Sequence, residues 1–414
     1  MNTSILRDHA RIIYEGAIEK SLPDSIVSDA LKELPQYGGK LILVAIGKAG
    51  YQMAKVAGDI LKDKIDSGIV ITKYHHVRGE INRVKCYEAG HPVLDENSLF
   101  APREALKLTD NLTKDDRVLF LVSGGGSALF EDTDCTLEEL QELNKALLDC
   151  GADISEINTI RKRVSNVKGG RFAIHCSPAT VYCVMMSDVV GDRVDMIASG
   201  PACADSSSTE YALSVVKKYG LKLNDKIISL IKKETPKSLD NVISRVAGGT
   251  VALAKHAREI AEGLGYKATI ISDSVTGEAR ELGKEIGKIA KENQDTKEPL
   301  AFIYTGETVV YIKGDGKGGR NQEIALSACQ YIRDMESCVA FSVGTDGTDG
   351  PTDSAGGICD SKTYERIMES KKTPEEYLKN NDSYNALKAS GDLIITGPTG
   401  TNVNDLTVLL INPQ

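Results

Sequence analysis

The sequence contains no tryptophan, and aromatic residues make up only 5% of its 414 positions. So few rings argue against base-stacking surfaces and aromatic sugar-binding platforms. Nine cysteines are present, but no Cys-x-x-Cys pair and no zinc-type histidine spacing occurs, which predicts free thiols in a reducing compartment. No apolar run approaches the length of a membrane span, and the charged N-terminus lacks the apolar centre of a signal peptide. We therefore expect a cytoplasmic protein.

The net charge is −9, so the surface as a whole would repel nucleic acids and anionic membranes. We expect neither as a partner. A chain of 414 residues is long for one hydrophobic core, because domains typically hold about 100–200 residues. The sequence thus predicts two domains and leaves open whether the chain forms a homo-oligomer.

Short apolar runs alternate with helical patterns, which is typical of the α/β class. Residues 41–47 read as a strand buried on both faces of a sheet. Residues 117–126 read as a strand that enters a glycine-rich turn, and residues 180–188 as a strand that ends on an acid. Residues 299–314 are predicted to form two strands joined as a hairpin at Gly306–Glu307. A composition change near 220–243 places the domains at 1–235 and 236–414. The N-terminal helical pattern, broken at Pro23, could dock on either domain.

Two loops that follow predicted strands in the first domain carry residues suited to anions. The segment SGGGSA, 123–128, has three consecutive glycines before a helix, and bare glycine amides allow a phosphate or carboxylate to approach. Lys48 emerges directly after the first strand. A plain strand-to-helix turn and an unpaired surface lysine explain the same residues without a ligand, so both interpretations stay open.

The second domain contains KGDGKGGRNQE, 313–323, in which Gly314, Gly316 and Gly319 match G-x-G-x-x-G. No strand-ending acid follows about 20 residues later, as a dinucleotide site requires. The loop is better suited to presenting Arg320 to a transferred phosphoryl group. Acidic segments at 187–202 and 344–357 could bind Mg²⁺ or accept a hydroxyl proton, although many loop aspartates only form turns or helix caps.

Eight motifs in order resemble those of the type II glycerate kinases, and they cover nearly the whole chain. They are GKAG…MA (47–54), GHPVLDENS (90–98), SGGGSA (123–128), NTIRKRVSNVKGGR (158–171), SDVVGD…DMIASGP (187–201), GKGGRNQE (316–323), GTDGTDGPTD (344–353) and TGPTGTNVND (396–405). The resemblance implies two three-layer α/β domains with an interdomain cleft. The first would be Rossmann-like and the second the leucine-rich, MOFRL-like domain of the family.

The resemblance also implies an activity and its residues. Members phosphorylate D-glycerate at the 2-hydroxyl, using ATP and Mg²⁺ or another divalent cation. The implied catalytic residues are Lys48, Asp188 and Arg320, with Asp188 as the candidate base. Asp346 and Asp188 are the implied metal ligands. The expected substrate-binding residues are Lys48, Ser123, Gly124, Gly125, Gly126, Ser127 and Asn404.

Two other functions remain as alternatives. A hydroxypyruvate reductase would use the Gly314–Gly319 loop for a nicotinamide cofactor, although the acid expected for the ribose is missing. A non-catalytic sugar-acid or nucleotide-binding regulator would not need Lys48, Arg320 and paired acids together. The sequence does not distinguish the preferred metal or nucleotide, or which aspartate is the base.

Overall fold

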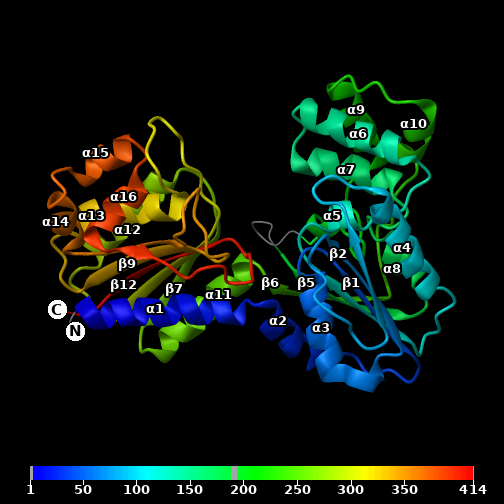
Figure 1. Cartoon of the computed structure of the whole chain (residues 1–414), viewed down its shortest axis with the longest axis horizontal. Coiled ribbons are helices and arrows are strands. Elements are labelled where there is room, and N and C mark those ends of the chain that lie inside the picture. Colours follow the sequence, from blue (N-terminus) through cyan, green and yellow to red (C-terminus); the bar gives the residue numbers. More distant parts are fainter. Residues whose placement is uncertain (1–2, 188–193, 414) are drawn as a thin grey trace. The chain divides into compact units, whose positions relative to one another are not determined.

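The computed structural model describes residues 3–187 and 194–413, and they form two compact units (Figure 1). One unit combines Pro23–Ser187 with the described residues of Arg193–Ala247. The other combines the described residues of Met1–Leu22 with those of Gly248–Gln414. Each unit is built on one six-stranded sheet. No helix among the described residues has the length and apolar character to cross a membrane.

The sheet of the N-terminal unit has the strand order β3-β2-β1-β4-β5-β6. Its first five strands run parallel. Every residue of the central strand β1 is buried, as its unbroken apolar sequence predicts for a strand covered on both faces. The bounds are β1 Leu41–Ile46, β2 Ser67–Lys73, β3 Val84–Ala89, β4 Arg117–Val122, β5 Thr180–Met186 and β6 Val242–Gly248.

Some helices of this unit cover the sheet, whereas four others form a lobe with its own apolar core (Figure 1). The lobe contains α6, Leu137–Asp149, α7, Ile154–Val164, α9, Thr209–Lys218, and α10, Asp225–Ile231. The other helices of the unit are α2 Pro23–Leu31, α3 Gly50–Leu61, α4 Glu96–Leu108, α5 Gly126–Leu129 and α8 Arg171–His175, with single turns η1 Lys62–Lys64 and η2 Ile197–Ser199.

The sheet of the C-terminal unit has the order β11-β10-β9-β12-β8-β7. The last strand, β12, lies antiparallel between β8 and β9. The strands are β7 Lys267–Val275, β8 Leu300–Gly306, β9 Cys338–Gly344, β10 Gly356–Asp360, β11 Leu393–Ile394 and β12 Asp405–Ile411. Besides α1, Thr3–Lys20, the helices of this unit are α11 Thr250–Gly263, α12 Ala279–Glu292, α13 Arg320–Ile332, α14 Thr363–Met368, α15 Pro374–Lys379 and α16 Ser383–Ser390.

The hairpin expected within 299–314 is wrong. Residues 300–306 form β8, but its sheet neighbours are β12 and the parallel strand β7. Gly306 has φ +151°, and a Cβ placed there would lie 2.3 Å from the Val275 carbonyl oxygen. The chain leaves the sheet at this glycine and continues as a loop, in which Val309 forms only an isolated parallel bridge with Glu278.

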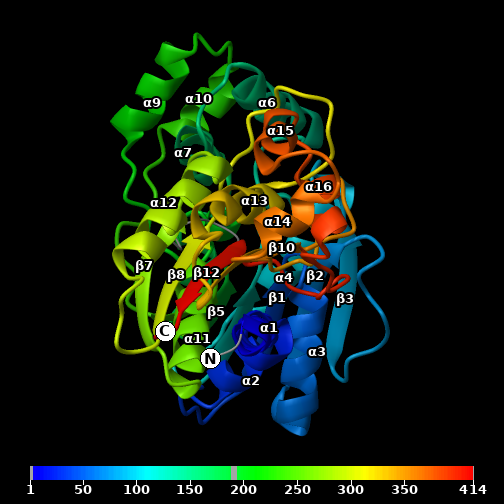
Figure 2. The same cartoon turned by 90° about the vertical axis from the view of Figure 1, so that its left-hand side faces the viewer.

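The first helix, α1, Thr3–Lys20, belongs to the C-terminal unit, where it packs along α11 and β9. Figure 2 looks down α1 and shows α11 beside it. The Arg7 guanidinium pairs with the buried carboxylates of Asp360 and Asp392. The two units divide between residues 247 and 248 and not between the expected 235 and 236, because β6 completes the N-terminal sheet.

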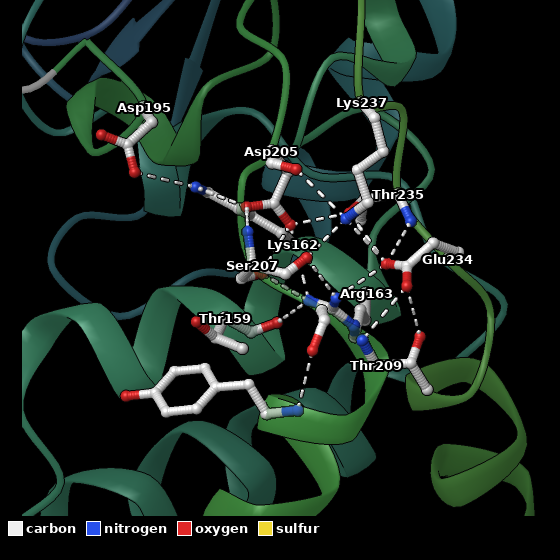
Figure 3. A network of polar contacts seen from close by, with 12 residues as sticks. Thr159, Lys162, Arg163, Asp195, Asp205, Ser207, Thr209, Glu234, Thr235 and Lys237 are labelled. Atoms are coloured by element: carbon white, nitrogen blue, oxygen red, sulfur yellow. Dashed lines mark hydrogen bonds and ion pairs between the residues drawn. The ribbon is translucent and has the colours of Figure 1, made fainter.

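A buried charge network ties α7 to the segments that follow β5 (Figure 3). The Lys162 ammonium lies 3.3 Å from Asp195 and 3.2 Å from Asp205. The Arg163 guanidinium contacts Asp205, Glu234 and Ser207, and its side chain is fully buried. These two basic residues of the NTIRKRVSNVKGGR motif are therefore occupied by partners within their own unit, which gives them a structural role.

Packing of α1 can be tested with two adjacent isoleucines. Ile13 is completely buried, whereas Ile12 is 44% exposed. Ile13→Ala should lower the free energy of unfolding by about 2–5 kcal/mol, because it leaves a cavity in the core. Ile12→Ala should cost less than about 1 kcal/mol. Urea unfolding of both variants measures the difference, and equal costs would contradict the described orientation of α1.

The charge network predicts an acid-sensitive N-terminal unit. Burial alone would raise the pKa of Asp205, but Lys162 and hydrogen bonds from Thr235 and Ser207 outweigh it and hold the pKa below its usual range. A lowered folded-state pKa stabilises the fold above the unfolded value of about 3.9 and loses that effect as pH falls through the folded value. Melting temperature should therefore fall steeply below about pH 4.

Asp205→Ala should lower the free energy of unfolding by about 3–5 kcal/mol at neutral pH, because it leaves Lys162 and Arg163 buried without this partner. The matched control is Asp240→Ala, which removes an exposed aspartate of the same unit and should change stability little. The Asp205 variant should also show a weaker fall in melting temperature with acid. Equal melting curves for the two variants would refute the structural role of the network.

Candidate functional site

The loops after β1 and β4 meet at the point where the order of the N-terminal sheet reverses. β1 lies between β2 and β4, and ligands of open α/β sheets bind beyond the carboxyl ends of strands at such a point. The Lys48 amide donates to the Gly124 carbonyl at 2.9 Å, and the Ala49 amide donates to Ser123 Oγ at 3.0 Å. The structure therefore brings together two motifs that the sequence places about seventy residues apart.

Lys48 is exposed, and its side chain lies beside the glycine turn. Gly125 has φ +86°, and a Cβ there would come within 3.1 Å of Lys48 Cγ and 3.0 Å of His91 Nε2. The turn thus requires a glycine for its conformation and for its close neighbours. No ion pair joins Lys48 to a carboxylate in the part of the chain that the structure describes. An ammonium group in this position is suited to an anionic ligand.

The glycine turn leads into α5, which has only four residues. Within it, Ser127 Oγ lies 2.9 Å from Ser199 Oγ, and the Ser199 hydroxyl donates to Asn158 Oδ1 at 2.8 Å. The sequence analysis assigned no role to Ser199 or Asn158, although both lie in recognised motifs. Only the fold shows that Ser199 contacts Ser127 and that Asn158 lies behind Ser199. Asp188, the candidate base and metal ligand, lies outside the described residues.

Arg320 begins α13 in the C-terminal unit and makes a two-point contact with Asp405. Its Nε lies 2.5 Å from Asp405 Oδ2 and its Nη2 lies 3.1 Å from Oδ1, while Nη1 lies 3.1 Å from Glu307. Burial would lower the pKa of Arg320, but Asp405 outweighs it and raises the pKa further, so the guanidinium stays charged. Burial raises the pKa of Asp405, and Arg320 opposes that rise.

The strand register explains why these groups meet. Asp405 pairs with Gly306 of β8 and with Gly344 of β9. Because β12 is antiparallel to both, its first residue lies at the ends of β8 and β9. The loops that begin at Glu307 and Thr345 therefore leave the sheet beside Asn404 and Asp405. The sequence analysis noted Asp405 only as part of a polar loop, since its partner is 85 residues away.

Asp346 and Asn404 lie in these adjoining turns. The Thr345 amide and hydroxyl both donate to the Asn404 carbonyl, at 3.0 and 2.6 Å. Asn404 is buried with φ +69°, a conformation that asparagine tolerates better than most residues. Asp346 is half-buried, and its Oδ1 accepts a hydrogen bond from the Thr348 amide at 2.9 Å. The structure thus places Arg320, Asp346 and Asn404 at one end of the sheet.

Asp349 caps the N-terminus of α13 and so fixes the backbone of Arg320. Its carboxylate accepts hydrogen bonds from the Asn321 and Gln322 amides at 3.1 and 2.8 Å. Burial nevertheless raises the pKa of Asp349 to about 6. A Cβ on Gly319 would lie 2.3 Å from the Asp349 carboxyl carbon, so this close cap requires the glycine.

A pocket of about 670 Å³ opens in the C-terminal unit beside Arg320. We call it the Arg320 pocket. One wall is apolar, and the remainder is polar or charged. The apolar wall consists of Val309, Val310, Ile312 and Pro351, and the charged lining includes Arg320, Glu307, Glu323 and Asp349. This volume is in the range of about 300–1,000 Å³ that small-molecule sites occupy.

The glycine-rich loop at 313–319 forms part of this pocket and is fixed by the segment 380–383. Asn381 Oδ1 accepts hydrogen bonds from the Lys313 and Gly314 amides at 2.7 and 3.0 Å. A Cβ on Gly314 or Gly316 would come within 2.5 Å of Asn380. These glycines therefore permit close packing of backbone on backbone, which the G-x-G-x-x-G pattern alone does not reveal.

No group of three or more histidine, cysteine, aspartate or glutamate residues in the described ranges is placed to hold a metal ion. Mg²⁺ in phosphoryl-transfer enzymes commonly takes one or two carboxylates and completes its shell with phosphates and water. A single half-buried carboxylate such as Asp346 fits that kind of ligation. The assignment of Asp346 and Asp188 as metal ligands stays a prediction.

Comparison with known proteins agrees with this geometry. Residues 9–232 match a domain of unknown function, DUF4147, and residues 300–405 match the MOFRL family. A protein named D-glycerate 2-kinase from Thermotoga maritima is 50% identical over 96% of this chain and 97% of its own. A protein named glycerate 2-kinase from Pyrococcus horikoshii is 40% identical over 91% of this chain and 88% of its own.

Solved structures give the same result. The crystal structure of the Thermotoga maritima glycerate kinase superposes with a TM-score of 0.92 at 50% identity, and the match covers 99% of this chain and 100% of the other. The likeness thus extends over both units and over every motif described above. The chain belongs to the type II glycerate kinase family.

Proposed function

We propose that the protein transfers the γ-phosphoryl group of ATP to the 2-hydroxyl of D-glycerate, which yields 2-phosphoglycerate and ADP. Family membership and the names of the similar proteins support the reaction. The structural observation that carries the proposal is Arg320, a permanently charged guanidinium that two carboxylates orient at the edge of a ligand-sized pocket. Such a group stabilises the charge that develops on a transferred phosphoryl group.

The Arg320 pocket is proposed as the nucleotide site. A three-carbon acid would fill a small part of it, whereas a nucleotide needs both the apolar wall and the polar lining. Several carboxylates would repel a triphosphate, but Glu323 pairs with Arg280 and Asp349 is held by helix amides. A divalent cation bound with the nucleotide neutralises phosphate charge, and Asp346 is the carboxylate proposed to hold it.

In the N-terminal unit, Lys48 is proposed to bind the carboxylate or phosphoryl charge. Ser123 and the glycines at 124–126 shape the turn beside it. Asn404, which lies in the C-terminal unit, is proposed to orient groups in that same unit. Asp188 remains the proposed base on the 2-hydroxyl. Among the described residues of the proposed site, only Lys48 and Arg320 carry positive charge. Removing one or the other should therefore affect different steps of the reaction.

The reductase alternative is not favoured by the structure. A nicotinamide cofactor would place its pyrophosphate against the glycines of a dinucleotide fingerprint. Here Gly314 and Gly316 pack against the segment 380–383, and Gly319 packs against Asp349, in each case on the side where a side chain would project. The loop follows a strand but is anchored to neighbouring backbone, which is a structural reason for its glycines.

The product distinguishes these functions. With ATP, Mg²⁺ and D-glycerate, we expect 2-phosphoglycerate as the main product by phosphorus NMR. Mainly 3-phosphoglycerate would show that the proposed regiochemistry is wrong. Hydroxypyruvate with NADH serves as the parallel assay, and loss of NADH absorbance without phosphorylation would favour the reductase. Absence of any turnover in both assays would favour a binding protein.

Arg320→Ala should lower kcat at least about 10²-fold with a smaller change in KM, because the guanidinium acts mainly in the transition state. Arg320→Lys should restore little, since a point charge does not reproduce the planar fork.

A second variant is needed as a control for stability, because loss of Arg320 leaves the buried Asp405 without its partner and destabilises the unit. Adding Asp405→Asn to Arg320→Ala removes that buried charge and should restore the melting temperature. Turnover should remain low in the double variant. Recovery of kcat together with stability would mean that Arg320 only holds the loop.

A further inference from the structure

The direction of the hydrogen bonds around Ser127 can be deduced from the atoms involved. Asn158 is buried, and its Nδ2 faces the Met196 sulfur at 3.6 Å. A thioether has no proton to donate, so the amide nitrogen belongs on that side and the amide oxygen faces Ser199. The single proton of the Ser199 hydroxyl is therefore used in its 2.8 Å bond to Asn158 Oδ1.

This arrangement fixes the role of Ser127. Ser199 has no second proton, so in its 2.9 Å contact with Ser127 it accepts, and Ser127 donates. The Ser127 hydroxyl then has only lone pairs left for a ligand. Ser127 is half-buried, and Ser199 is its one hydrogen-bond partner within the described ranges.

The backbone keeps this chain of hydroxyls in place. Ala198 and Ser199 both adopt positive φ, at +51° and +58°, and Gly200 follows at +66°. A run of left-handed residues costs free energy in non-glycine residues and persists only where the surroundings enforce it. Gly126, next to Ser127, lies against Ala198, where a Cβ would approach to 2.5 Å. The η2 turn and the glycine turn thus pack as one rigid pair.

We infer that Ser127 accepts a hydrogen bond from the substrate hydroxyl that is not phosphorylated, and that Ser199 and Asn158 are the positioning residues that impose this direction. The inference rests on the proposed function. This series of hydrogen bonds ends at the Asn158 amide oxygen, which is not a base at neutral pH and cannot carry a proton away. It is therefore unsuited to deprotonate the reacting 2-hydroxyl, and it suits a hydroxyl that keeps its proton, the 3-hydroxyl of D-glycerate.

The inference gives a specificity rule. A site built to accept from a hydroxyl disfavours analogues that lack its proton. D-lactate has hydrogen in place of the 3-hydroxyl, and hydroxymalonate has a carboxylate in place of the hydroxymethyl group, whose lone pairs would face those of Ser127. Wild-type protein should therefore bind both more weakly than D-glycerate. The expected preference over D-lactate from this contact is about 2- to 13-fold, the effect of one net hydrogen bond.

The test measures dissociation constants for the three acids by calorimetry, with a non-hydrolysable ATP analogue present. Ser127→Ala should remove most of the preference for D-glycerate over D-lactate. Ser199→Gly suits the positive φ and removes the acceptor of Ser127, whose proton can then turn toward the ligand. In that variant hydroxymalonate should bind several-fold better relative to D-glycerate, whereas Ser127→Ala should give no such gain.

Ser214→Ala, an exposed serine of the same unit, is the matched control and should leave all three constants unchanged. The inference is overturned if Ser127→Ala weakens D-glycerate and D-lactate equally, or if Ser199→Gly leaves the hydroxymalonate ratio unchanged. Failure of the proposed function gives a different result, because wild-type protein would then not phosphorylate D-glycerate at all. Melting temperatures of each variant confirm that it is folded.

Discussion

The antiparallel insertion of β12 between β8 and β9 is the constraint on which the proposed site residues of the C-terminal unit depend. It places Asp405 opposite Gly306 and Gly344, and so delivers a buried carboxylate to the first residue of α13. Arg320 is held at two points by this group. Without that pairing, the strand order would not hold the loops at 307, 345 and 404 together at one end of the sheet. The chemistry assigned to them therefore follows from strand order.

The N-terminal unit reaches a comparable result by a different route. Its strands are parallel, and the reversal of strand order at β1 brings the loops after β1 and β4 together. Direct hydrogen bonds between Lys48, Gly124, Ala49 and Ser123 join the two loops. Ser127 then takes its orientation from η2, a third segment. Each half of the proposed site is thus built from turns whose backbones support one another.

The sequence alone predicts those parts of the fold that depend on local pattern. The unbroken apolar runs at β1, β4 and β5 were sufficient to place strands, and the residues following them were sufficient to propose Lys48 and the glycine turn. The apolar pattern does not predict β6, because this half-exposed edge strand lacks an apolar run. It also fails for 309–312, where apolar residues line a pocket and Val309 makes only an isolated bridge to Glu278. Asp405 and Ser199 act through partners distant in sequence, which no local signal marks.

The placement of α1 has a consequence for how the chain is made. The helix is synthesised before the N-terminal unit, yet the sheet it covers is completed only by β12, which is synthesised after that unit. The whole N-terminal unit is synthesised in between, as an insertion within the C-terminal one. At about 5–20 residues per second, the apolar face of α1 waits for tens of seconds before its partners exist. The C-terminal unit, to which α1 belongs, is therefore the last to be completed. Its helix α1 must remain without its packing partners while the N-terminal unit folds.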